Sequence, residues 1–198
     1  MAAEIYKETN AYFMDNIAPT LSAVNKEITL LYRSYMKGQM EYHEVHQTGK
    51  VFYPDANSTL RVTYGKVKGY SPADAVYYTP ISSLDGIIAK DNPDIYDYDI
   101  PQRLRDLHAE KDYGQWEVNG SVPFIATNHT SGGNSGSPVL DGNGNLIGVN
   151  FDRVWEGTMS DVVYDPEICR NISLDIRYAL FVIDKLAGAS HLLKEMEV

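Results

Sequence analysis

At 198 residues, the chain is long enough for one well-packed core, or for one core with a helical extension. Its net charge of −10 argues against a nucleic-acid partner, and no basic stripe offsets that charge. No stretch approaches about 18 uncharged apolar residues, so we expect no membrane span. Cys169 is the single cysteine, which excludes an internal disulfide, and we expect neither a metal nor a cofactor.

The N-terminal quarter of the chain predicts a helix from residue 3 to about residue 45, because apolar residues recur there at spacings of four and three. The resulting apolar stripe consists of Ile17, Leu21, Val24, Ile28, Leu31 and Tyr35. Gly38 and Gly49 bracket the region where the helix should end. Because the rest of the chain offers few other long helices, we expect this stripe to pack on polypeptide outside this chain.

From about residue 50, the pattern changes to one typical of β-structure. Residues 59–70 alternate polar and apolar side chains and are rich in β-formers, which predicts a strand. The pair Asn119-Gly120 lies between apolar stretches and predicts a hairpin over residues 116–126. We expect further strands within residues 136–151 and over residues 159–164.

Three shorter helices are also expected. The first two cover residues 82–90 and 101–111, and Pro101 suits the first turn of the second. The third begins with Ser173 as its N-cap and ends at Gly188. Its apolar face consists of Ile176, Ala179, Leu180, Ile183 and Leu186.

Residues 130–138 carry the strongest functional signal. They read Thr-Ser-Gly-Gly-Asn-Ser-Gly-Ser-Pro, and a Gly-x-Ser-Gly-x-Pro run between apolar strands is typical of the nucleophile loop in chymotrypsin-fold proteases. Ser135 is the predicted nucleophile, and the backbone N–H groups of Gly133 and Ser135 are the predicted oxyanion hole. The alternative is an ordinary Gly- and Ser-rich loop that joins two strands.

The residues after this loop predict a hairpin, because apolar strands flank a turn rich in Asp-Gly and Asn-Gly. Asp141, Asn143 and Asn145 alternate as in a calcium loop, but Leu146 and Asp152 stand where such a loop needs Gly and Glu, which excludes calcium. The whole pattern predicts a mainly β fold. We expect the second β-barrel of a chymotrypsin-like double barrel, with an N-terminal helical segment and a C-terminal helix.

A serine nucleophile needs a base and an orienting carboxylate. Of the five histidines, His129 lies six residues before Ser135, where a structural role is the favoured interpretation. The others lie at a helix end, in a predicted surface helix or after the serine: His43, His46, His108 and His191. We therefore expect the chain to be a piece of a larger enzyme, with the nucleophile but without the half that activates it.

Several stretches resemble one family, the bacterial serine dipeptidyl peptidases of the dipeptidyl-peptidase 7 and 11 group. The resemblance rests on residues 52–70, 132–138, 150–157 and 164–189, and so covers nearly the whole chain. The Asp/Glu-specific type is the most similar. Members of this family are several times longer than this chain, and carry a large helical domain between the His-Asp and Ser parts of the triad.

The resemblance implies a domain organisation and a location. Residues 1–45 would be the tail of the inserted α-helical domain, and residues 46–198 the nucleophile-bearing β-barrel with its terminal helix. The family is exported to the periplasm or cell surface of Gram-negative bacteria, and the full-length enzyme is a possible homodimer. The N-terminus here lacks the basic start and apolar run of a signal peptide, so we expect that signal outside this chain.

The resemblance also implies two substrate-binding residues. Asp152 would bind the free N-terminal ammonium of the peptide, and Arg153 would bind an Asp or Glu side chain before the scissile bond. Arg153 lies eighteen positions after Ser135, where relatives that prefer apolar side chains have Gly. The alternatives are an Asp152 that caps a turn and an Arg153 that pairs with Glu156 or Asp161 on the surface.

Three functions remain open from the sequence. The leading one is part of a serine exopeptidase that releases N-terminal dipeptides through an acyl-enzyme, and we expect the fragment alone to be inactive. The second is a glutamyl endopeptidase on the same barrel. The third is a non-catalytic binding domain that keeps the loop without the chemistry. The expected partners are peptides with a free N-terminus and the remainder of the parent polypeptide.

Overall fold

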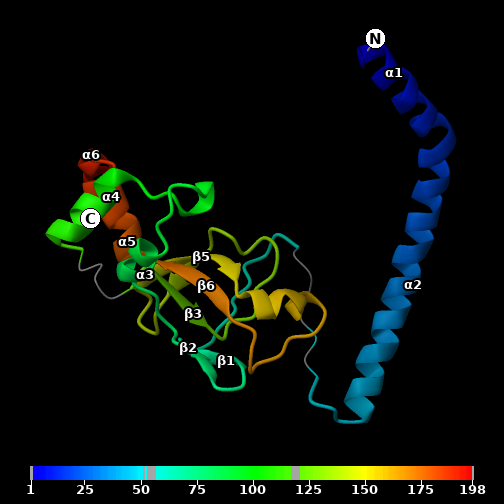
Figure 1. The fold of residues 1–198 in the computed structure, drawn as a ribbon. Coiled ribbons are helices and arrows are strands. Elements are labelled where there is room, and N and C mark those ends of the chain that lie inside the picture. Colours follow the sequence, from blue (N-terminus) through cyan, green and yellow to red (C-terminus); the bar gives the residue numbers. More distant parts are fainter. Residues whose placement is uncertain (1, 51, 53–56, 117–120, 198) are drawn as a thin grey trace. The chain divides into compact units, whose positions relative to one another are not determined.

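The computed structural model describes residues 2–50, 52, 57–116 and 121–197, and these divide into two compact units (Figure 1). The N-terminal unit is Met1–Leu60 and the C-terminal unit is Arg61–Val198. Helices account for 46% of the described residues and strands for 16%, so the described part of the chain has more helix than the mainly β fold that we expected. Much of this helix is the long N-terminal helix, which was expected, and the shortfall in strand arises because two predicted strands do not form.

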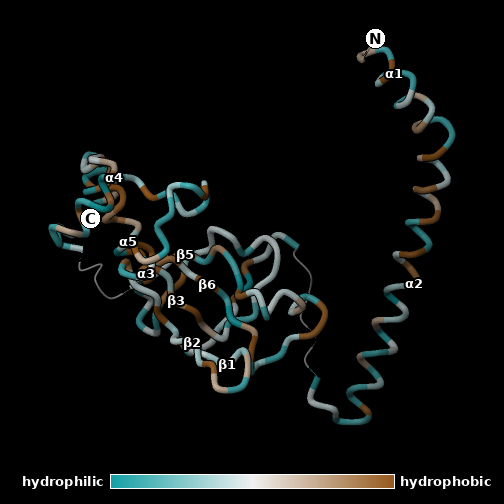
Figure 2. The backbone as a smooth tube through the Cα atoms, viewed as in Figure 1, coloured by the Kyte–Doolittle hydropathy of each residue, from teal (hydrophilic) through white to brown (hydrophobic). Residues whose placement is uncertain are grey.

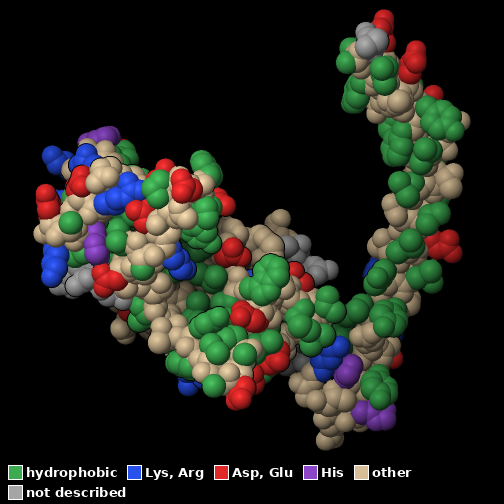
Figure 3. All heavy atoms as spheres, in the orientation of Figure 1, with side chains coloured by type: hydrophobic (Ala, Val, Ile, Leu, Met, Phe, Trp, Pro, Cys, Tyr) green, Lys and Arg blue, Asp and Glu red, His purple; other side chains and the backbone are tan. Residues whose placement is uncertain are grey.

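The N-terminal unit is a nearly continuous helix, as predicted. It consists of α1 (Ala2–Tyr12), a π-turn (Phe13–Ile17) and α2 (Ala18–Val45). The wider turn lies just before Pro19, which lacks an N–H and crowds the preceding turn of an α-helix. Hydrophobic residues recur between hydrophilic ones along α2 (Figure 2), and hydrophobic side chains are exposed along its length (Figure 3). Taken by itself, this unit buries no residue of its helices.

The C-terminal unit is built on a four-stranded antiparallel sheet with the strand order β3-β6-β5-β4. Its strands are Pro123–Ala126 (β3), Pro138–Leu140 (β4), Leu146–Arg153 (β5) and Asn171–Asp175 (β6). A two-stranded sheet is formed by Tyr70–Ala73 (β1) and Val76–Tyr78 (β2). The predicted hairpin is present as β4 and β5, because Asp141 accepts the N–H groups of Asn143 and Asn145 at 2.8 and 2.9 Å and closes the turn.

Two predicted strands are wrong. Residues 59–69 are irregular apart from an isolated bridge at Val67, although they run beside β3, where the N–H of Thr127 donates to the carbonyl of Lys66. Residues 155–161 form a 3₁₀-helix, η3 (Trp155–Asp161), in place of the strand expected from residue 159. Alternation alone predicted both strands. Residues 66–68 lie along the free edge of β3 but form only an isolated bridge there, and the carbonyls of Lys68 and Gly69 accept from Arg170 instead. Strand β5 has no free edge for residues 159–164, because β4 and β6 pair with its two sides.

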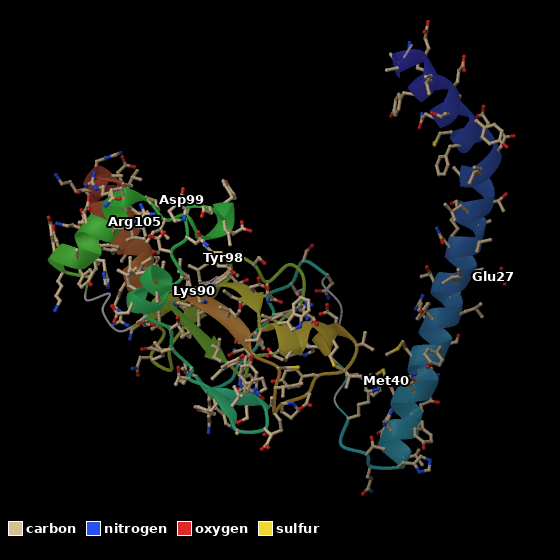
Figure 4. All side chains as sticks on the ribbon, viewed as in Figure 1. Glu27, Met40, Lys90, Tyr98, Asp99 and Arg105 are labelled. Atoms are coloured by element: carbon tan, nitrogen blue, oxygen red, sulfur yellow. The ribbon has the colours of Figure 1, made fainter. Side chains whose placement is uncertain are left out.

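The predicted short helices are present as α3 (Leu84–Ala89) and α4 (Gln102–Glu110), with Pro101 as the N-cap of α4. A separate 3₁₀-turn, η2 (Tyr96–Tyr98), lies between them. Arg105 of α4 donates to Asp91 through Nε and Nη2 at 2.6 and 2.8 Å, and to Asp99 at 3.2 Å, which ties the η2 loop to α4 (Figure 4).

The C-terminal helices are α5 (Ile176–Phe181), a π-turn (Val182–Leu186) and α6 (Ser190–Glu195). The expected N-cap, Ser173, is wrong, because Ser173 is fully buried in β6. The cap is Asp175, whose carboxylate accepts the N–H of Arg177 at 2.9 Å. The chain does turn at Gly188, as predicted, with φ +65°. The hairpin expected over residues 116–126 falls partly on residues 117–120, outside the described residues.

The core of the C-terminal unit lies where α3, α4, α5 and α6 gather at one end of the larger sheet (Figure 1). Its buried apolar side chains are Leu84, Leu104, Leu107, Trp116, Val122, Phe181 and Leu193. The indole N–H of Trp116 donates to Asp184 at 2.9 Å, so this ring is anchored as well as buried.

Arg170 is a second centre of organisation, 2% exposed, just before β6. Its guanidinium donates to the carbonyls of Lys68 and Gly69 at 3.0 Å each, and to three carbonyls of residues 166–169. It also lies over the ring of Tyr70, 5.6 Å from the centroid. A buried guanidinium with every side saturated by carbonyls avoids the cost of an unpaired charge, so it fixes the irregular segment before β1 against β6.

Candidate active site

The loop between β3 and β4 folds as tight turns around Asn134. The N–H of Ser131 donates to the Asn134 side chain at 2.9 Å, and the N–H of Ser137 donates to the Asn134 carbonyl at 3.0 Å. Gly133 and Gly136 adopt φ values of +97° and +84°, which are strained for residues with a Cβ. These two glycines therefore allow the reversal that exposes Ser135 between them.

Strand β5 holds this loop through Asn150, a buried side chain that sequence reasoning missed. Its Nδ2 donates to the carbonyl of Asn134 at 3.2 Å, and its Oδ1 accepts from Asn171 of β6 at 2.9 Å. Its backbone carbonyl accepts the N–H of Gly136 at 2.8 Å. A buried Asn in an apolar strand needs hydrogen-bond partners, and this requirement could have indicated a structural role for Asn150 from the sequence. Asn150 thus links the candidate nucleophile loop to the sheet.

The hydroxyl of Ser135 donates to the carbonyl of Phe151 at 3.2 Å. Phe151 lies at a bulge of β5, between the paired residues Asn150 and Asp152, so its carbonyl is not used in the ladder with β6. Among the residues that the structure describes, the backbone N–H groups of Gly133 and Ser135 have no protein acceptor. Two amide donors beside an exposed hydroxyl can stabilise an oxyanion on an atom bound to that hydroxyl.

The two expected substrate-binding residues directly follow the bulge of β5. Asp152 and Arg153 directly follow Phe151, whose carbonyl accepts from Ser135. Asp152 is exposed, and one of its oxygens accepts the N–H of Arg153 at 2.7 Å. The structure therefore places Asp152 and Arg153 on the strand that contacts Ser135, and Gly133 in the loop that carries Ser135.

Arg153 pairs with Asp161, one of the two surface partners considered from the sequence. Its Nη1 and Nη2 donate to the two oxygens of Asp161 at 3.0 and 2.9 Å, and Nη1 also donates to the hydroxyl of Ser160 at 2.5 Å. The hydrogen bonds from Arg153 hold the pKa of Asp161 below its ordinary value. Glu156, the other partner considered, instead accepts from the hydroxyl of Tyr70 at 2.6 Å.

The helix η3, which carries Ser160 and Asp161, is anchored at several points. The Tyr70–Glu156 hydrogen bond holds its first turn, and burial, followed by the hydrogen bond to Glu156, raises the pKa of Tyr70. Nε2 of His129 lies 3.0 Å from the carbonyl of Ser160. Helix η3 packs closely at Gly157, because a Cβ added there would lie 3.3 Å from Cα of Cys169.

The histidines have other partners than the serine. His129 contacts Ser160 and stacks at 4.8 Å on the ring of Tyr164, and His108 lies 2.7 Å from Asp85. In the N-terminal unit, Nδ1 of His43 lies 2.6 Å from the hydroxyl of Thr48. Within the described part of the chain, the side chain of Ser135 makes its hydrogen bond to Phe151 and to no imidazole.

The described residues offer neither a membrane-spanning helix nor a metal site. Over residues 2–50, 52, 57–116 and 121–197, no helix combines the length and the apolar character needed to cross a membrane. Over the same residues, no three side chains of the His, Cys, Asp or Glu type gather closely enough to hold a metal ion.

A glycine-rich loop that exposes a serine beside two backbone N–H groups without protein acceptors is typical of serine hydrolases. Comparison with known proteins gives the family: the peptidase S46 family model matches residues 2–198, and the chain belongs to this family. The chain is 58% identical over 188 residues to an Asp/Glu-specific dipeptidyl-peptidase of Flavobacterium psychrophilum. It is 42% identical over 188 residues to dipeptidyl-peptidase 7 of Phocaeicola vulgatus.

The solved structures agree with this family. DPP11 of Porphyromonas endodontalis in complex with substrate matches with a TM-score of 0.77 and 40% identity, over 94% of this chain and 28% of that chain. The two curated relatives are covered in the same way, over 94% and 93% of this chain and 26% of their own length. The chain thus spans about a quarter of the length of the relatives it matches.

Proposed function

We propose that this chain is the nucleophile-bearing part of a serine exopeptidase that releases dipeptides from the N-terminus of peptides, with Asp or Glu before the scissile bond. One observation carries the proposal: Ser135, in a loop where the N–H groups of Gly133 and Ser135 have no protein acceptor among the described residues, donates to the bulge of β5 that Asp152 and Arg153 directly follow. Relatives named as Asp/Glu-specific dipeptidyl-peptidases support the substrate class.

In the proposed reaction, Ser135 Oγ attacks the carbonyl carbon of the second residue of the peptide, while a base takes the proton of the hydroxyl. The N–H groups of Gly133 and Ser135 stabilise the oxyanion of the tetrahedral intermediate. The intermediate collapses, the shortened peptide leaves with a proton on its new amine, and the dipeptide stays as an ester on Ser135. Water then hydrolyses the ester and releases the dipeptide.

Asp152 and Arg153 bind the two charged groups of the substrate in this proposal. The exposed carboxylate of Asp152 pairs with the free α-ammonium, a group that an exopeptidase must recognise. Arg153 binds the Asp or Glu side chain, which the net charge of −10 would otherwise repel. In the complete enzyme, Asp152→Ala should cripple cleavage of peptides with a free amine. Equal cleavage of N-acetylated and free peptides by the unmutated enzyme would instead favour a glutamyl endopeptidase.

The domain organisation is also part of the proposal. Residues 1–45 are the tail of a helical domain, residues 46–198 are the second β-barrel, and the base and its carboxylate come from the remainder of the polypeptide. The short coverage of the relatives' length and the contact of Ser135 with a carbonyl support this view. The complete enzyme would act in the periplasm or at the cell surface of a Gram-negative bacterium, and a homodimer is compatible with the family.

A fluorophosphonate probe tests the assignment of the nucleophile. The isolated 198-residue chain should label barely, because no imidazole takes the proton of Ser135, whereas the complete enzyme should label at Ser135. Ser135→Ala in the complete enzyme is the control and should abolish labelling.

Strong labelling of the isolated chain would mean that it holds its own base, which would contradict the proposed dependence on the remainder of the polypeptide. A complete enzyme that does not label at Ser135 would overturn the assignment of the nucleophile, and one that labels there but cleaves no peptide would favour a binding domain.

A further inference from the structure

The guanidinium of Arg153 has two edges that can each donate two hydrogen bonds to a carboxylate, and a protein carboxylate binds only one of them. Asp161 takes the end edge, formed by Nη1 and Nη2, and Ser160 takes a second hydrogen of Nη1. The side edge, formed by Nε–H and the outer N–H of Nη2, donates to no protein acceptor among the described residues. The Arg153 side chain is 20% exposed, so the protein does not enclose it completely.

Other arginines of the same unit show how the side edge binds carboxylates. Arg105 grips Asp91 with Nε and Nη2 at 2.6 and 2.8 Å, and Arg177 grips Asp175 with the same two atoms at 3.0 and 2.7 Å. In both pairs the two parallel N–H groups meet the two oxygens of one carboxylate. Arg153 differs because its aspartate partner lies at the end edge, which leaves the two-point side edge for a second carboxylate.

The aspartate that holds Arg153 belongs to an anchored element. Helix η3 is fixed at Glu156 by Tyr70 and at the carbonyl of Ser160 by His129. Immediately before η3, the N–H of Val154 donates to the carbonyl of Arg170 at 3.0 Å. Asp161 therefore clamps the Arg153 guanidinium to a fixed frame, and the direction of its open edge is set by that frame.

We propose that Asp161 is a positioning residue that determines specificity: it holds the end edge of Arg153 so that the side edge faces the acidic side chain of the substrate. This inference rests on the proposed function, since it requires Arg153 to bind that side chain. Ser160 assists by fixing the rotation of the guanidinium about its end edge.

A positioning role and a purely electrostatic role of Asp161 predict opposite effects of removing its carboxylate. The Asp161 carboxylate repels an acidic substrate, so a purely electrostatic role predicts that its removal improves binding. A positioning role predicts the opposite, because an arginine without its clamp must be ordered by the substrate itself. Asp161→Asn keeps an oxygen acceptor without the charge, and therefore separates the two effects.

The experiment measures kcat and KM of the complete enzyme on two dipeptidyl substrates that differ only in Glu or Gln before the scissile bond. Asp161→Ala should lower kcat/KM for the Glu substrate about tenfold, mainly through KM, and leave the Gln substrate within about twofold. Asp161→Asn should restore most of the loss. Inhibition by the product dipeptides ending in Glu and Gln should follow the same order, which checks binding without turnover.

The matched control is Asp99→Ala, which removes a carboxylate of similar exposure, 54% against 52%, from Arg105. It should leave both substrates unchanged. If Arg153→Gly abolishes the preference for Glu while Asp161→Ala leaves it intact or strengthens it, the inference fails and the proposed function stands. If Arg153→Gly leaves the preference intact, the role of Arg153 in the proposed function fails, and the inference fails with it. Should Asp161→Ala not fold, Asp161→Asn decides: a small rise in KM for the Glu substrate alone supports the inference, and a KM for Glu that is unchanged or lower contradicts it.

Discussion

The two ends of the C-terminal unit are held together by different interactions. At one end of the larger sheet, α3 to α6 enclose an apolar core around Phe181, which is fully buried (Figure 1). At the other end, the serine loop, the bulge of β5 and η3 are joined mainly by hydrogen bonds through Asn150, Arg153 and Tyr70. Trp155 and Val162 of this second end are 84% and 88% exposed.

This difference indicates that stability and chemistry are separated in the unit. Burial of apolar area is non-directional and tolerates small displacements, whereas hydrogen bonds and ion pairs fix directions. The helical end therefore supplies folding free energy, and the loop end supplies geometry. Substitutions at the two ends should then affect different measurements.

The largest effect should come from the helical end. Phe181→Ala empties a fully buried site among Leu104, Tyr113 and Tyr178, and should lower the free energy of unfolding by about 3–5 kcal/mol. Calorimetry of the complete enzyme should show a lower unfolding temperature, with kcat/KM nearly unchanged at temperatures where the variant is folded. Leu192→Ala, 38% exposed on α6, is the control and should change little. A normal unfolding temperature with lost activity would contradict the separation.

At the loop end, Arg153→Gly should change specificity more than stability. The loss of one charge-assisted contact with a carboxylate should cost about 2–5 kcal/mol of transition-state binding, roughly thirtyfold or more in kcat/KM for Asp and Glu substrates. The preference should move toward apolar residues, and calorimetry should show a smaller change than for Phe181→Ala. Kinetics on a series of dipeptidyl substrates check this outcome. An intact preference for Asp and Glu would make Arg153 a surface residue.

Asn150→Ala tests whether the sheet sets the geometry of the serine loop. The change removes the hydrogen bond to the Asn134 carbonyl and leaves Asn171 without one acceptor, at a cost of about 1–3 kcal/mol. We expect kcat to fall while KM stays similar, because the loop that carries Ser135 loses its tie to β5. Asn145→Ala, which removes an amide contact in the exposed hairpin turn, is the control. Equal effects of the two variants on kcat would show that Asn150 has no special role.

The smallest effect concerns the N-cap of α5 and depends on pH. Burial raises the pKa of Asp175, but the hydrogen bonds from Arg177 outweigh burial and leave the pKa below its ordinary value. A carboxyl with a lowered folded pKa adds stability above its unfolded pKa of about 3.9, and this stability is lost as the pH falls through the folded pKa. Asp175→Ala should therefore cost about 0.5–2 kcal/mol at pH 7, and the difference should shrink in acid.

Unfolding midpoints of the two proteins, measured from pH 7 down to about pH 3, check this expectation. Asp106→Ala on the exposed face of α4, where the carboxylate accepts from Gln102, is the control. A difference between Asp175→Ala and the unmutated protein that stays constant down to pH 3 would mean that the charge of Asp175 contributes nothing.

The sequence predicted the elements that carry their own local signals. The long helix, α3, α4 and the β4–β5 hairpin were predicted from periodicity, Pro101 and the Asn-Gly turn. The failures lie where a partner far along the chain decides the structure. Residues 59–69 alternate like a strand but form only an isolated bridge with β3, and the carbonyl of Lys68 accepts from Arg170 instead. Ser173, a good cap by type, lies inside β6.

The candidate site was predicted in its residues but not in its supports. The glycine pattern around Ser135 is local, so the sequence alone indicates the loop, and Asp152 and Arg153 entered through the family resemblance. Asn150 was missed because its role depends on Asn171, twenty-one positions later. Asp161 was considered only as an alternative to substrate binding, whereas the geometry leaves room for both partners on one guanidinium.

The buried guanidinium of Arg170 also sets an order of events during synthesis. The carbonyls of Lys68 and Gly69 lie 102 and 101 residues before it, so they leave the ribosome well before their donor exists. At about 5–20 residues per second, the segment before β1 waits roughly 5–20 seconds for Arg170. Until then the N–H of Val154, just before η3, lacks its acceptor on Arg170, so this part of the unit cannot complete its contacts before Arg170 emerges.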